Sequence, residues 1–341
     1  MEKERIKFID LAKGFCIIMV VWYHVDIHNL IYFNEQTGWF FQSFRMPLYF
    51  MLSGFFISFR KGHKQFIENK INKIIIPFMF FIFITNTIFW IIKDIFHGYD
   101  MGYFDSPFQW VSGLQFWYDW QNCGLNNTPL WFLCALFNAY MIYLIIDKIT
   151  KGKEVLTLVI LISVSIISNI LLFYNIQIPF LIGTALQNLI FIIVGNQIRK
   201  RTSILQSKQS ASVNISVAIL LFGVLYFTVL AYHTMNNFIA ERFIYYFNGI
   251  IGTIAIILIS KTINYIPIVS YFGRYSIVVL GLHQPIMGNI MKIFRLLFEN
   301  EVLIKTCTLF ITLAICLLCI KILVRFLPWF VAQKNLIYFK A

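Results

Sequence analysis

The amino-acid sequence predicts an all-α, polytopic membrane protein. Of its 341 residues, 59% are hydrophobic and only 13% are charged, and the mean hydropathy is +0.75. A soluble domain of this length needs far more polar surface. The apolar residues form runs of helix length, without the strict alternation of a membrane β-strand. We therefore expect the net charge of +13 to reflect orientation in a membrane and not nucleic-acid binding.

Ten apolar runs are long enough for a transmembrane helix, which needs about 20 mostly apolar residues. They lie near residues 8–26, 39–59, 74–92, 129–147, 155–174, 178–198, 212–232, 242–260, 269–291 and 306–327. The last run and the tail 328–341 carry no recognisable motif. The chain contains no internal repeat and no low-complexity tract, so we predict one membrane domain over residues 1–341.

The lysines and arginines outside these runs predict the orientation, because cytoplasmic loops are enriched in both. With a cytoplasmic N-terminus, the inner segments hold 19 of these residues and the outer segments hold 5. A missed crossing would make so uneven a split over ten helices improbable, so we predict that both termini are cytoplasmic.

The longest predicted outer loop, residues 93–128, differs from the others because it is acidic and rich in tryptophan. Together with Trp131, it contains half of the eight tryptophans in the chain. Two interpretations are open: an aromatic belt at the membrane surface, or a lip on which sugar rings stack.

The first apolar run carries ionisable side chains that a lipid-facing helix usually lacks. Lys13 and His24 are eleven residues apart, so a helix places both on the same side, about 16 Å apart along its axis. Asp10 lies one turn before Lys13 on that side. These groups could line a path through the membrane. Alternatively, Lys13 reaches the interface and His24 is satisfied by a neighbouring helix.

The second run begins near Arg45, and we place Pro47 in its first turn and Ser53-Gly54 in its middle. Arg45 is either an anchor at the outer interface or a functional group. The small Ser53-Gly54 pair permits close approach of another helix.

Three further polar positions have both a functional and a structural interpretation. Lys70 and Lys73, in the loop before the third run, could bind phosphates or follow the orientation rule. His283 precedes Pro285, which frees a backbone carbonyl, and is either functional or simply hydrogen-bonded. The CxxC pair of Cys316 and Cys319 has no histidine or carboxylate beside it, so we predict no metal site.

Five segments, in order, resemble motifs of the acyltransferase-3 family of integral-membrane acyltransferases. The branch that this chain resembles is the fucose-4-O-acetylase-like, or polysaccharide O-acetyltransferase, branch. The matching residues are Lys13 and His24; Met46, Pro47, Ser53 and Gly54; Lys73 and Pro77; Pro129, Trp131, Phe132 and Leu133; and Gly273, Ser276, His283 and Pro285. Many members have arginine where this chain has Lys13 and Lys73, which keeps the charge but loses bidentate phosphate binding.

The resemblance implies ten helices and transfer of an acyl group, most simply acetyl, from cytoplasmic acyl-CoA. The acceptor would be a hydroxyl of a cell-surface or lipid-linked glycan. His24 would act as the general base, because imidazole titrates in the right range. A covalent acyl-histidine route is equally open.

The other implied roles follow from the same resemblance. Lys13, with Lys70 and Lys73, would lie near the phosphates of the acyl-CoA co-substrate, and Asp10 would pair with Lys13. The candidates for substrate contact, including the donor to the oxyanion, are Arg45, Ser53, Trp131 and His283.

Two other classes of function remain open at this point: a transporter of small polar solutes and a glycan flippase without acyl chemistry. A transporter of this size typically has paired broken helices in repeated halves, which the sequence lacks. We expect membrane lipids and a glycan acceptor as partners and a location in the cell membrane, the inner membrane of a bacterium. The sequence leaves the oligomeric state open.

Overall fold

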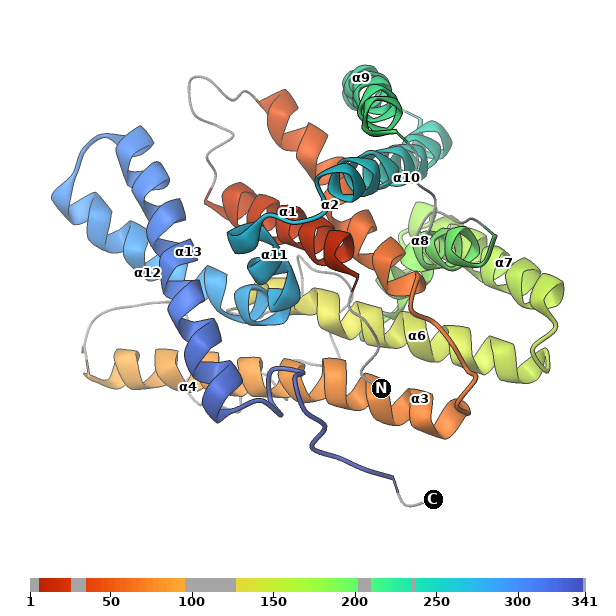
Figure 1. Ribbon diagram of the computed structural model, residues 1–341, viewed down its shortest axis with the longest axis horizontal. Helices are drawn as coiled ribbons and strands as arrows, with labels where there is room; N and C mark the ends of the chain where they lie inside the picture. The colour runs from red at the N-terminus through yellow and green to blue at the C-terminus, as the bar shows by residue number, and fades with distance from the viewer. Residues whose placement is uncertain (1–5, 26–34, 96–126, 202–209, 235–236, 340–341) are drawn as a thin grey trace. The chain divides into compact units, whose positions relative to one another are not determined.

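The computed structural model describes residues 6–25, 35–95, 127–201, 210–234 and 237–339 (Figure 1). Its helices are α1 (Lys7–His24), α2 (Glu35–Gly54), α3 (His63–Lys70), a π-helical turn (Ile71–Ile75), α4 (Ile76–Ile95), a 3₁₀ turn (Thr128–Leu130), α6 (Trp131–Ile149), α7 (Glu154–Phe173), α8 (Ile182–Arg201), α9 (Ala211–Thr234), α10 (Phe238–Ile263), α11 (Pro267–Arg274), α12 (Ser276–Leu297) and α13 (Glu301–Phe326). No strand occurs within these ranges, so the all-α prediction is confirmed for them.

Seven helices in the described part of the chain are long and apolar enough to cross a membrane. They are His63–Ile88, Thr128–Ile149, Glu154–Phe173, Ala211–Ala231, Phe238–Ile263, Ser276–Leu297 and Glu301–Phe326. The three other predicted runs are also helical, as α1, α2 and α8. These carry more polar side chains; α1, for example, contains Lys7, Asp10 and Lys13. The total of ten spans and the orientation of the termini stay predictions.

Helix α2 differs from the predicted helix at both ends. It begins at Glu35 because the polar stretch before Trp39 is helical too, which a scan for apolar residues does not detect. It ends at Gly54, where the N–H of Ile57 turns back to the Gly54 carbonyl (3.2 Å). The prediction that Ser53-Gly54 lies in mid-helix is therefore wrong. Pro47, placed in the first turn by the sequence, instead lies inside the helix.

The predicted span 269–291 is two helices, and most of the predicted loop 60–73 is helical. α11 ends at Arg274, and Tyr275 leaves helical geometry (φ −114°, ψ 27°) before α12 begins. α3 and the π-helical turn fill residues 63–75. The sequence pattern could not reveal the break in the span, because apolar residues continue on both sides of it.

The first of two compact units contains residues 1–57, 188–276 and 298–309. In this unit α1 packs against α2, α10 and α11. Glycines permit the closest approaches: a Cβ on Gly14 would meet the backbone of Val269, and one on Gly273 would meet the backbone of Asp10. Side chains larger than hydrogen at Gly14 and Gly273 would therefore separate α1 from α11.

The second unit contains residues 58–187, 277–297 and 310–341. Asn127, just before α6, donates to the carbonyl of Gly281 in α12 (2.6 Å). The ring of Phe81 from α4 occupies the space that a Cβ on Gly281 would need. In this unit, α7 exposes a wide apolar face, with Val155 72% exposed and Val159 55% exposed.

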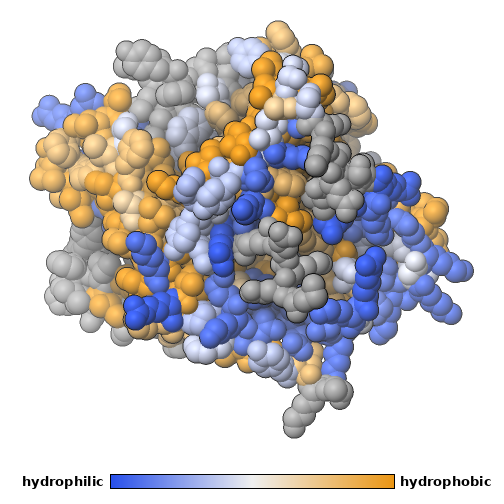
Figure 2. Space-filling model, in the orientation of Figure 1, coloured by the Kyte–Doolittle hydropathy of each residue, from blue (hydrophilic) through white to orange (hydrophobic). Residues whose placement is uncertain are grey.

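Apolar side chains also cover wide areas of the face shown in Figure 2. Exposed apolar area of this extent on helices of spanning length is typical of a surface in contact with lipid.

Candidate active site on α1 and α2

Helix α1 carries Asp10, Lys13 and His24 within one continuous helix, and all three side chains are half-buried. The predicted spacing therefore holds, with Lys13 and His24 on one side and about 16 Å apart along the axis. His24 is the last residue of the helix. One face of α1 thus carries a cation in the first half of the helix and an imidazole at its end.

The backbone of α1 at Lys13 is held by a buried tyrosine of α2. The hydroxyl of Tyr49 donates to the Lys13 carbonyl (3.2 Å). The same hydroxyl is hydrogen-bonded to Ser276. A tyrosine has only one O–H to donate, so Ser276 must donate to it. The Lys13 ammonium itself lies 5.6 Å from the centre of the Phe56 ring.

Arg45 is a buried guanidinium in the middle of α2 and is only 7% exposed. Its Cζ lies 3.6 Å from the centre of the Tyr23 ring, and that ring stands edge-on to the imidazole of His24 at 5.9 Å. The Tyr23 hydroxyl donates to Gln42 (3.4 Å). One tyrosine ring therefore contacts both the predicted base and a buried cation.

The guanidinium of Arg45 keeps one N–H group available. Its Nη1 atom is buried, and no acceptor among the described residues bonds to it. The Arg45 carbonyl accepts from the Cys16 thiol (2.7 Å) and so helps to fix α2 against α1. A buried donor without an acceptor is costly, so Nη1 is a candidate donor to a bound group.

Gly54 contributes packing at the end of α2, as the sequence predicts. A Cβ on Gly54 would meet the backbone of Ile192 in α8, and a Cβ on Gly195 would meet the backbone of Met51. The two glycines thus let α2 and α8 cross closely. The adjacent Ser53 is half-buried, and its predicted contact with substrate stays a prediction.

Lys70 and Lys73 belong to the second unit, and both ammonium groups make contacts within the protein. The Lys70 side chain is 8% exposed and lies over Tyr140 at 3.5 Å and Phe66 at 5.0 Å. The Lys73 ammonium donates to the carbonyl of Ala332 (2.6 Å). Their predicted contact with acyl-CoA stays a prediction.

Trp131 and His283 also belong to the second unit. Trp131 is half-buried at the start of α6. His283 is fully buried in α12, and its Nδ1 lies 2.8 Å from the Val279 carbonyl. Since a carbonyl only accepts, Nδ1 donates its proton to this carbonyl. This bond matches the structural interpretation of His283. The other predicted tryptophans, at positions 110, 117 and 120, lie outside the described residues.

Sequence reasoning did not identify Tyr23 or Tyr49 as part of this site. Both lie in aromatic, apolar surroundings where one tyrosine does not stand out. A usable signal for Tyr23 was Arg45: a guanidinium within an apolar helix needs a partner, and an aromatic face is a common one.

The fold and the site define an all-α membrane protein with ionisable groups buried between its first two helices. The family described as "Acyltransferase domain" matches residues 6–321. The match covers most of the chain, which therefore belongs to the acyltransferase-3 family and is a membrane acyltransferase. No curated protein and no solved structure matches the chain.

The described residues contain no group of three or more histidine, cysteine, aspartate or glutamate side chains that could hold a metal ion.

Proposed function

We propose that this protein is an O-acyltransferase, most simply an O-acetyltransferase, that uses cytoplasmic acyl-CoA. The acceptor is a hydroxyl group of a cell-surface or lipid-linked glycan, and the enzyme acts in the cell membrane, the inner membrane of a bacterium. Family membership supports acyl transfer. The observation that carries the proposal is the pairing of Lys13 and His24 on one face of α1.

His24 acts as the general base in this proposal. Its imidazole removes the proton from the acceptor hydroxyl, and the oxygen attacks the carbonyl carbon of the thioester. As the new C–O bond forms and the C–S bond breaks, the imidazolium returns the proton to the leaving thiolate. Such proton transfer typically raises the rate about 10²–10⁴-fold.

Arg45 stabilises the negative charge that develops on the carbonyl oxygen. Its buried Nη1 supplies an N–H, and the guanidinium lies over the Tyr23 ring, which stands edge-on to the imidazole of His24. A donor fixed before the reaction is effective because it needs no reorganisation as the charge develops. Of the candidates for this role, Arg45 is the one whose contacts connect it to His24 within one compact unit.

Lys13, in the first half of α1, binds a phosphate of the acyl donor, and Asp10 orients it by charge pairing. Replacing Lys13 with alanine should raise the KM for acyl-CoA more than the KM for the acceptor. Lys13→Arg should change both much less because the charge is retained. Steady-state kinetics with each substrate varied in turn would measure this. An unchanged KM for acyl-CoA in Lys13→Ala would mean that Lys13 only reaches the interface.

The topology of this proposal places both termini and residues 60–73 in the cytoplasm. In a cysteine-free background, Lys64→Cys should react with an impermeant maleimide only after the cells are opened. Glu299→Cys, exposed between α12 and α13, should react in intact cells and serves as the matched control. Labelling of position 64 in intact cells would contradict the proposed orientation.

Transfer of radiolabelled acetyl groups from acetyl-CoA to glycan, measured in membranes with and without the protein, tests the function. We expect label in the glycan only when the protein is present. Mass spectrometry of surface glycans from strains with and without the gene would then identify the acetylated sugar. Unlabelled glycan in both membranes, with the protein correctly inserted, would favour a flippase or transporter.

A further inference from the structure

The C-terminal segment (residues 327–339) returns to the junction between α3 and α4 and is fixed there by side chains. Asn72, fully buried in the π-helical turn, accepts from the backbone N–H groups of Leu336 (2.6 Å) and Ile337 (2.9 Å). Its amide donates to the Ile337 carbonyl (2.8 Å). The Glu68 carboxylate accepts from the N–H of Phe339 (3.0 Å). These bonds, spanning more than 250 positions of sequence, hold the segment in one place.

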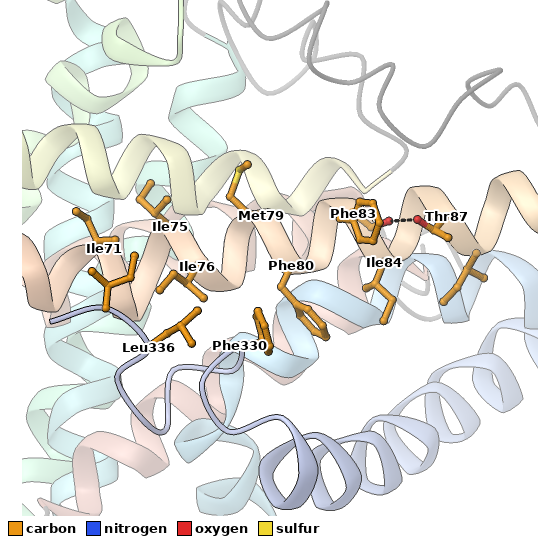
Figure 3. A pocket seen from close by; sticks show the side chains of 12 residues that line it. Ile71, Ile75, Ile76, Met79, Phe80, Phe83, Ile84, Thr87, Phe330 and Leu336 are labelled. Carbon is orange, nitrogen blue, oxygen red and sulfur yellow. Dashed lines mark hydrogen bonds between the residues drawn. The ribbon is translucent and has the colours of Figure 1, made fainter.

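A cavity of about 590 Å³ lies between this fixed segment and α4. Figure 3 shows Ile76, Phe80 and Ile84 pointing from α4 toward Phe330 and Leu336 of the C-terminal segment. The rings of Phe80 and Phe330 are stacked, with their centres 5.1 Å apart. The C-terminal segment therefore forms one wall of the cavity and α4 forms the other.

The lining of this cavity is apolar except for one threonine. Its one polar side chain is Thr87, and the Thr87 hydroxyl donates to the carbonyl of Phe83 (2.7 Å), as the dashed line in Figure 3 shows. Several lining side chains are exposed, among them Met79 at 44% and Phe83 at 43%, so the cavity is open at the surface. The wall formed by α4 belongs to a helix of membrane-spanning length and apolarity, His63–Ile88. An apolar lining of this kind favours a hydrocarbon chain as the bound group.

Two ammonium groups lie on the segments that form the walls. In the sequence, Lys73 lies between the lining residues Ile71 and Ile75, and its Nζ donates a hydrogen bond to the carbonyl of Ala332. An ammonium has three donors, and this is the one hydrogen bond that Lys73 makes within the described residues. Lys334 is exposed, between the lining residues Phe330 and Leu336. A ligand with a negative head and an apolar chain complements this combination.

We propose that this cavity binds one anionic phospholipid, with an acyl chain between α4 and the C-terminal segment and the phosphate at Lys73 and Lys334. The proposal does not depend on the acyl-transfer function. It gives the C-terminal segment, which carries no family motif, a role as the wall of a lipid site.

Native mass spectrometry of the full-length protein tests the proposal. The protein is purified from nanodiscs that contain equal amounts of phosphatidylglycerol and phosphatidylcholine with identical chains. We expect wild-type protein to retain one phosphatidylglycerol, with a preference over phosphatidylcholine of about fivefold for each lysine that contacts the phosphate. Met79→Trp, which adds bulk to the lining, should lose this lipid, and Lys73→Gln should lose the preference for the anionic headgroup.

Two further variants separate the cavity from general lipid adhesion. Ile219→Trp, on the exposed face of α9, should retain the lipid as wild type does. Asn72→Leu, which leaves the lining intact but removes the bonds to the C-terminal segment, should lose it. Equal retention by Met79→Trp and wild type, no retained lipid in wild type, or equal retention of both headgroups would each overturn the proposal. Thermal melting confirms that each variant is folded.

Discussion

His24→Gln should lower turnover about 10²–10⁴-fold while the protein folds and inserts as wild type does. Glutamine keeps much of the size of histidine and can form hydrogen bonds, but it cannot accept a proton at neutral pH. A purely structural histidine would tolerate this change and lose stability on replacement by alanine. A general base would lose activity in both variants, with little change in melting temperature. Acetyl transfer and thermal melting, measured on the same purified samples, distinguish the two roles.

His63→Gln is the matched control for this experiment. His63 is a partly exposed histidine in α3 that lies 3.3 Å from Asp147 and has no role in the proposed chemistry. Its replacement should leave turnover within a fewfold of wild type. If His24→Gln kept more than about a tenth of wild-type turnover, the proposed mechanism would be wrong. Such a variant would have lost less than tenfold in rate, whereas loss of a general base costs at least about 10²-fold. His283, which lies well inside α12, would be the next residue to examine.

Much of the fold could be predicted because apolar length and local charge are recorded directly in the sequence. All ten predicted runs contain helix. The boundaries of α2 and the break between α11 and α12 could not be predicted in the same way. Polar residues extend α2, and α11 contacts α1 closely at Gly273, through residues that lie far apart in the sequence.

The site was predictable only where one helix carries it. The spacing of Lys13 and His24 within α1 follows from helical geometry alone. The contact of Tyr23 with Arg45 depends instead on how α2 packs against α1, since 22 positions separate these residues along the chain. Likewise, the bonds from Asn72 to Leu336 and Ile337 leave no trace in a periodic pattern. Contacts between distant segments are therefore what the structure adds to the sequence.

Arg45→Met should lower kcat about 10²–10³-fold, the usual cost of removing one donor to a developing oxyanion, with a smaller effect on the KM for acyl-CoA. Methionine is apolar and close in volume to the aliphatic part of arginine, so the buried position should accept it with little loss of stability. The kcat of Arg45→Lys should lie between that of wild type and that of Arg45→Met. Lysine keeps a charge, but it lacks the planar group that lies over the Tyr23 ring and the N–H fork that presents Nη1.

Arg242→Met is the control for the loss of an arginine from an aromatic face. Arg242 lies over the ring of Tyr245 at 5.0 Å in the same compact unit, but it has no proposed role in the reaction. Its replacement should remove a similar stacking contact, worth about 0.5–2 kcal/mol, without the loss in kcat. Tyr23→Phe keeps the ring beneath Arg45 and should retain most of the activity, whereas Tyr23→Leu should approach the defect of Arg45→Met. If Arg45→Met were folded and its kcat lay within tenfold of wild type, Arg45 would be a structural cation, and the oxyanion donor would have to be sought elsewhere.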